Sequence, residues 1–129
     1  MLMRIPVSIG EILDKNSILE IKSERISDEK KLINVRHELG ALDDELSKLE
    51  GLWGAVGDLY VQLKAVNEEL WVIEDDIRIK EAKKEFDNIF IDLARSVYVT
   101  NDKRANIKKE INLTMGSDLV EEKSYEDYQ

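Results

Sequence analysis

The chain has 129 residues, with 28 Asp and Glu against 19 Lys and Arg, one His, one Pro, no Cys and a formal net charge of -9. This length suits one domain, and the lack of Cys excludes disulfides and thiolate chemistry. The acidic balance argues against a nucleic-acid partner, and no uncharged stretch approaches the roughly 20 apolar residues that cross a bilayer. We therefore expect a cytoplasmic protein with no membrane insertion.

Two helices are predicted in the first half of the chain. Ser8 and Glu11 have the spacing of a capping box, with Val7 and Ile12 as the flanking hydrophobic staple, so a helix should begin at Ser8. A second helix should follow the cap at Asp28 and end at Gly51. Its apolar residues recur at alternating spacings of three and four, as in a coiled coil: Leu32, Val35, Leu39, Leu42, Leu46 and Leu49.

Two more helices are predicted after a connector with three glycines over residues 51–57. Asp58 is the expected cap of a helix over about 58–84, and Asp87 is the expected cap of a helix that ends at Gly116. Both continue the alternating apolar spacing. The β-branched run 97–100, followed by Asn101, has low helix propensity, so a kink or break is expected there.

Together these patterns predict an all-α fold, an antiparallel bundle of about four long helices arranged as two helical hairpins. Residues 1–116 would form this bundle domain. Residues 117–129, with a net charge of -4, would form a short non-helical acidic arm packed on the bundle or on a neighbouring subunit. Seams this regular also suit self-association, so we expect a homo-oligomer, with a dimer favoured.

Several polar residues interrupt the apolar arcs of the predicted helices. We expect the carboxylates of Glu20 and Glu74 to face cations across the bundle. Segment 95–109 carries a net charge of +4 in this acidic chain. The candidate set is Glu20, Glu74, Arg78, Arg95, Tyr98, Asn101, Arg104 and Lys108.

Two interpretations of this set remain open. The first is a buried ion-pair network that fixes the register of the helices, because buried charges persist when they are paired and hydrogen-bonded. The second is a pocket for a small anionic ligand, with Arg104, Lys108 and Arg95 as anion contacts and Tyr98 or Trp71 as walls.

Catalytic and metal chemistry find little support. The chain has no Ser/His/Asp or Cys/His set, and its one histidine, His37, lies off the apolar seam on the outward side of its helix. Helical nucleotide pyrophosphatases carry paired Glu-x-x-Glu and Glu-x-x-Asp motifs. This chain has a single such match, Glu11 with Asp14, and Glu11 is already assigned to the cap. We therefore expect no catalytic residues, no metal and no cofactor.

Three long stretches carry a family resemblance. They read SIGEILDK with ILEIK near the start, LARSVY with TND and then RA and IK in the fourth predicted helix, and GS with LVEEKSY in the arm. The sequence resembles a family of small uncharacterised proteins in bacteria and their viruses, a domain of unknown function, over nearly the whole chain. One departure is Asn16, where similar proteins tend to have an apolar residue.

The resemblance implies kinship, with an association to glycosyltransferase or surface-polysaccharide contexts, and it implies no chemistry. The first functional hypothesis is a non-enzymatic, self-associating helical interaction protein, linked through the resemblance to surface-glycan machinery. The alternative is a small-molecule enzyme or ligand-binding protein that holds a small anionic substrate in the bundle. Glu20 and Glu74 are the only general bases it could offer, so the balance favours the first hypothesis.

Overall fold

The computed structural model describes residues 1–129 and contains four α-helices and no strands. Helix α1 spans Ile9–Arg25, α2 spans Glu29–Leu46, α3 spans Leu52–Ala82 and α4 spans Asn88–Met115. The predicted all-α class and the two helical hairpins, α1–α2 and α3–α4, are thereby confirmed. No helix combines the length and apolar character needed to span a membrane.

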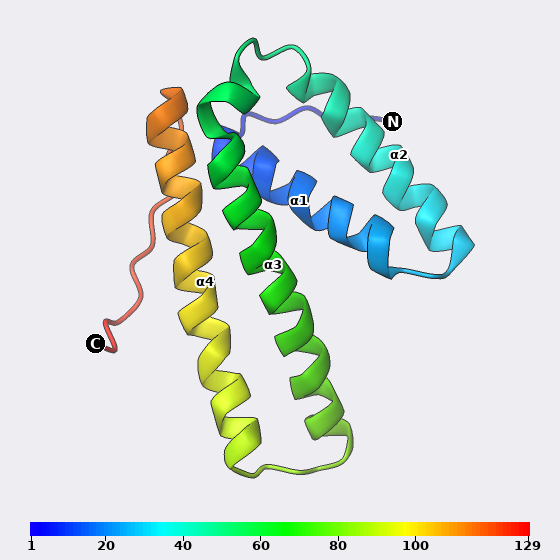
Figure 1. The fold of residues 1–129 in the computed structure, drawn as a ribbon, viewed down its shortest axis with the longest axis vertical. Helices are drawn as coiled ribbons and strands as arrows, with labels where there is room; N and C mark the ends of the chain where they lie inside the picture. The colour runs from blue at the N-terminus through cyan, green and yellow to red at the C-terminus, as the bar shows by residue number, and fades with distance from the viewer.

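The helices are arranged around a long antiparallel pair (Figure 1). Helices α3 and α4 lie side by side along the long axis of the molecule, and α1 crosses them near the end where α3 begins and α4 finishes. Helix α1 contacts all three other helices, whereas α2 packs mainly on α1. The opposite end of the α3–α4 hairpin consists of these two helices and their connecting loop alone.

Three of the predicted helix starts are correct because the expected side chains cap them. The Ser8 Oγ accepts a hydrogen bond from the Glu11 N–H at 3.1 Å. Asp28 accepts from the N–H groups of the first turn of α2, and Asp87 accepts from the Phe90 N–H at 3.0 Å. Each cap satisfies a backbone donor that has no partner within its helix. The Glu11 carboxylate does not complete the capping box, because it bonds to Lys108 instead.

The predicted connector was wrong at both of its ends. Helix α2 ends at Leu46 and not at Gly51, and α3 begins at Leu52 and not at Asp58. Leu52 and Val56 are each 1% exposed. Burial of these two side chains stabilises a helical conformation of the glycine-spaced segment. This outweighs the low helix propensity of the glycines in the segment. Gly51, at φ 71°, makes the left-handed turn that starts α3.

The expected break in α4 is also absent, because the helix runs without interruption from Asn88 to Met115. Each β-branched residue costs only a few tenths of a kcal/mol of helix propensity. α4 packs along α3, and Thr100, within this stretch, is 4% exposed. Tertiary packing along α3 outweighs this local cost.

The main apolar core lies where α1 crosses the hairpin. It comprises Leu13, Leu46, Leu52, Val56, Tyr60, Leu63 and Ile111. By contrast, no residue between 68 and 99 is buried. We call residues 68–99, the end of the α3–α4 hairpin beyond the core, the distal hairpin.

Candidate functional site

Helices α1 and α4 approach each other closely at Gly10. The Gly10 N–H donates a hydrogen bond to the Asn112 Oδ1 at 2.6 Å. A Cβ at position 10 would lie 2.6 Å from the Lys108 carbonyl oxygen, which is closer than real Cβ contacts allow. Glycine is therefore required here for space, and the close approach brings charged side chains of α1 within reach of α4.

The centre of these polar contacts is Asp14, which is 1% exposed. The Arg104 guanidinium bonds both Asp14 carboxylate oxygens, with Nε 2.9 Å from Oδ1. The Asn67 Nδ2 of α3 donates to the same Oδ1 at 2.9 Å. Burial by itself raises the pKa of Asp14, but the hydrogen bonds from Arg104 and Asn67 and the nearby positive charges outweigh it and hold the pKa below its usual value of 3.8.

The second cation, Lys108, is surrounded by three carboxylates. Its Nζ lies 2.7 Å from Glu11, 3.1 Å from Glu121 of the C-terminal arm and 3.6 Å from Asp14. Burial lowers the pKa of Lys108, and the hydrogen bonds to Glu11 and Glu121 more than compensate, so the pKa is raised. We call this cluster the Asp14 network; its members are Glu11, Asp14, Asn67, Arg104, Lys108 and Glu121.

Glu20 belongs to a separate cluster between α1 and α3. The Tyr60 hydroxyl donates to the Glu20 Oε1 at 2.7 Å, and the Lys64 Nζ lies 3.3 Å from the other Glu20 oxygen. Burial, followed by the hydrogen bond to Glu20, raises the pKa of Tyr60, so the hydroxyl keeps its proton. The cluster therefore joins α1 to α3 with a neutral tyrosine.

Asn16 is 1% exposed in this second cluster. Its Nδ2 donates to the Tyr60 hydroxyl at 3.1 Å, and its Oδ1 has no hydrogen-bond partner. The side chain thus fills a core position, as an apolar residue would, and adds one bond to α3.

The other candidates lie outside both clusters. Glu74 and Arg78 pair with each other at 3.3 Å along the exposed side of α3, and neither faces Arg104 or Lys108 as expected. The reason is their position along α3: its last hydrogen bond to α1 is made by Asn67, and Glu74 and Arg78 lie about two and three turns further on. Arg95 is exposed on α4.

Tyr98 and Asn101 contact the C-terminal arm. The rings of Tyr98 and Tyr128 pack edge to face at 4.9 Å between centroids, and the Asn101 carbonyl accepts from the Lys123 Nζ at 3.5 Å. Together with Val97, Asp102 and Tyr125, these residues line a shallow hollow of about 450 Å³ between the arm and α4. Its cation, Lys123, lies 3.7 Å from Asp102.

Four members of the Asp14 network were not among the predicted site residues: Glu11, Asp14, Asn67 and Glu121. Asp14 lies outside the apolar arc that the sequence indicates for the first helix. The buried arc of α1 is wider than this pattern suggests because three helices contact α1 from different sides. The signal that was available is the Glu11-x-x-Asp14 spacing, which places both carboxylates on one side of a helix.

Chemically, the Asp14 network holds helices together and offers no reactive group. Its two cations each contact at least one carboxylate directly, and Asp14 is held ionised by three donors, so it is a poor proton acceptor. No three His, Cys, Asp or Glu residues are placed to hold a metal ion. His37 is exposed on α2.

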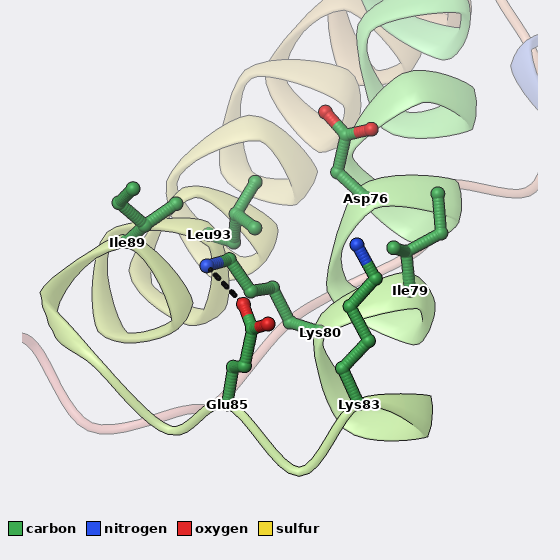
Figure 2. A pocket seen from close by; sticks show the side chains of 7 residues that line it. All are labelled: Asp76, Ile79, Lys80, Lys83, Glu85, Ile89 and Leu93. Atoms are coloured by element: carbon green, nitrogen blue, oxygen red, sulfur yellow. Dashed lines mark hydrogen bonds and ion pairs between the residues drawn. The ribbon is translucent and has the colours of Figure 1, made fainter.

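A second hollow, of about 240 Å³, lies at the tip of the distal hairpin (Figure 2). Ile79 of α3 and Ile89 and Leu93 of α4 supply its apolar lining. Lys80, at its edge, bonds to Glu85 at 2.9 Å and to Asp87 at 2.8 Å, which ties the connecting loop to α3. None of the residues predicted from the polar pattern lies in this hollow.

Comparison with protein-family models gives one match, to a family of unknown function (DUF6165), over residues 3–128. Searches of the curated proteins and of the solved structures return no match. The family match includes all four helices and nearly all of the arm. The chain therefore belongs to the DUF6165 family.

Proposed function

We propose that this protein is a non-enzymatic helical interaction protein that self-associates as a dimer. The observation that supports this proposal is the distal hairpin, 32 consecutive residues without one buried side chain. Four large apolar residues there are at least half exposed: Ile79, Phe86, Ile89 and Ile91. Covering a large apolar side chain that is half exposed stabilises a complex by about 1 kcal/mol, half the value for a fully exposed one, so this surface favours a partner.

The total surface area supports the same conclusion. A compact monomer of this mass exposes about 7,000 Å² by the usual scaling of area with molecular mass. This chain exposes 9118 Å², an excess of about 2,100 Å². The extended segments at both ends supply part of the excess, and the two-helix distal hairpin supplies part. Stable homodimers bury about 1,000 Å² or more per partner, so the excess is large enough for such an interface.

The alternative function is binding of a small anion. The Asp14 network supports it less strongly than the distal hairpin supports self-association. Its two cations are already bonded to carboxylates of the chain itself, and an incoming anion would have to displace Glu11, Asp14 or Glu121. Charge-assisted bonds from partly buried cations to carboxylates are strong, and each displacement leaves an unpaired carboxylate.

The proposal is tested by the mass of the protein in solution. Light scattering and sedimentation equilibrium at micromolar to hundred-micromolar concentration should give twice the chain mass of 14.9 kDa. Dilution below the dissociation constant should return the mass toward that of one chain, because dimerisation follows mass action. A mass of one chain at every concentration would contradict the proposal.

A further inference from the structure

One broad face of the distal hairpin carries opposite charges on either side of an apolar centre. Asp76, Ile79 and Lys83 lie on one stripe of α3, at spacings of three and four residues. Asp76 and Lys83 make no ion pair, whereas the nearby Lys80 bonds to Glu85 and Asp87. Ile79, between the two free charges, is 52% exposed and borders the apolar hollow.

This face is distinct from the surface that α1 uses. α3 contacts α1 through Tyr60, Lys64 and Asn67. The same helical spacing continues that stripe through Trp71, Glu74 and Arg78, and none of these lines the hollow. We call the stripe of Asp76, Ile79 and Lys83, together with the hollow beside it, the hollow face. α1 does not cover this face of α3.

We propose that the hollow face is the dimer interface and that a second copy covers it in antiparallel orientation about a two-fold axis near Ile79. This inference rests on the proposed self-association. A two-fold axis brings each residue opposite its symmetry partner, so an axis between positions 79 and 80 places Asp76 of one copy opposite Lys83 of the other, twice. The same axis brings the two Ile79 side chains together at the centre.

The apolar residues of both helices fit this register. Ile89, which is 59% exposed, and Leu93 lie across the hollow from Ile79, so they are at the level of the axis in both copies. Val72, which is 45% exposed, falls level with the partner's loop between α3 and α4, where Phe86 is 56% exposed. Opposite charges therefore flank an apolar centre, which is the arrangement that sets the register of an antiparallel pair.

The decisive experiment is a charge swap at low ionic strength, where exposed ion pairs are least screened. Asp76→Lys and Lys83→Glu should each raise the dimer dissociation constant at least tenfold, because each places like charges opposite one another twice. Mixing the two single variants should restore dimers, since both contacts in the mixed pair are again between opposite charges. The double variant should also regain the dimer. Circular dichroism establishes that every variant is folded.

Matched controls come from α2. Asp44→Lys and Lys31→Glu make the same charge changes at exposed positions that form no ion pair, and both should leave the dissociation constant unchanged. A second measurement uses the absence of cysteine from the chain. Ile79→Cys should form an intermolecular disulfide on oxidation, whereas Val61→Cys, five helical turns away on the same stripe, should not.

The outcomes separate this inference from the proposed function. If the wild-type protein is a monomer, both fail. If it is a dimer but the single charge variants bind as tightly as wild type, or the mixture stays dissociated, the interface lies elsewhere and only the inference is overturned. A peptide or another protein that binds the hollow face while the wild type stays monomeric would also overturn it.

Discussion

At the scale of single residues, Asp14 is the side chain on which the packing of α1 against α4 depends most. Asp14→Asn removes the negative charge between Arg104 and Lys108, and breaking a buried ion pair in this way costs about 3 kcal/mol. Urea unfolding at neutral pH should show this loss of stability. Glu74→Gln is the matched control, because it removes a carboxylate from an exposed pair with Arg78 and should cost no more than about 0.5 kcal/mol.

The same carboxylate gives the stability a predictable pH dependence. Because the folded-state pKa of Asp14 lies below 3.8, its contribution is fully present above the unfolded-state value and is lost as pH falls through the folded-state pKa. The stability difference between wild type and Asp14→Asn should therefore be constant from pH 7 to about 5 and should shrink below about pH 4. Urea midpoints across this range measure it, and a difference that stayed constant down to pH 2 would contradict the assignment.

Gly10 is the second residue whose identity is dictated by its surroundings. Gly10→Ala would place a methyl group against the Lys108 carbonyl and the Asn112 side chain, both backed by α4. We expect a loss of about 1–3 kcal/mol from overpacking, despite the higher helix propensity of alanine. Chemical denaturation measures the effect. An unchanged or increased stability would mean that α1 and α4 separate at no cost.

At the scale of elements, the beginning of α3 has its own test. Gly57 lies within α3 and has nothing within 4 Å of an added Cβ. Gly57→Ala should therefore stabilise the protein by about 0.5–1 kcal/mol, because it removes the entropic cost of a helical glycine. Thermal unfolding compares it with Gly51→Ala, which should destabilise because Gly51 has φ 71°. A loss of stability in Gly57→Ala would favour the loop that the sequence had suggested.

The elements show which sequence signals are reliable in this chain. Ser8, Asp28 and Asp87 each mark a helix start, since a cap acts within one turn and needs no tertiary contact. Glycine spacing misplaced the start of α3, and β-branched residues suggested a break in α4. In both cases the opposing effect is packing of residues distant in sequence, which local propensity does not contain.

Among the polar residues, too, local sequence signals predicted some features, and the features that depend on tertiary packing were missed. Arg104 and Lys108 were predictable because each interrupts an otherwise apolar stripe of its own helix. Their partners were not, because the choice of Asp14 over Glu20 or Glu74 depends on where α1 crosses α3 and α4. A helical periodicity places residues around one axis and contains no information on the crossing point of two axes.

At the scale of the whole molecule, burial is concentrated at one end. The core and the Asp14 network lie together where α1 crosses the hairpin, and most of the distal hairpin has only its own two helices for cover. The acidic arm adds contacts along α4 through Glu121, Lys123 and Tyr128, and it reaches the distal hairpin only at its edge, at Val97 and Tyr98. The regular apolar spacing of α3 and α4 therefore continues well beyond the region that the chain itself can bury.

The length of α3 determines how far apart the buried ends of two chains would lie in a dimer. From Leu52 to Ile79 the helix rises about 40 Å at 1.5 Å per residue. Two copies joined near Ile79 in antiparallel orientation would place the beginnings of their α3 helices about 80 Å apart, at opposite ends of one rod. The two apolar cores of such a pair would then lie at a separation that the number of residues in α3 determines.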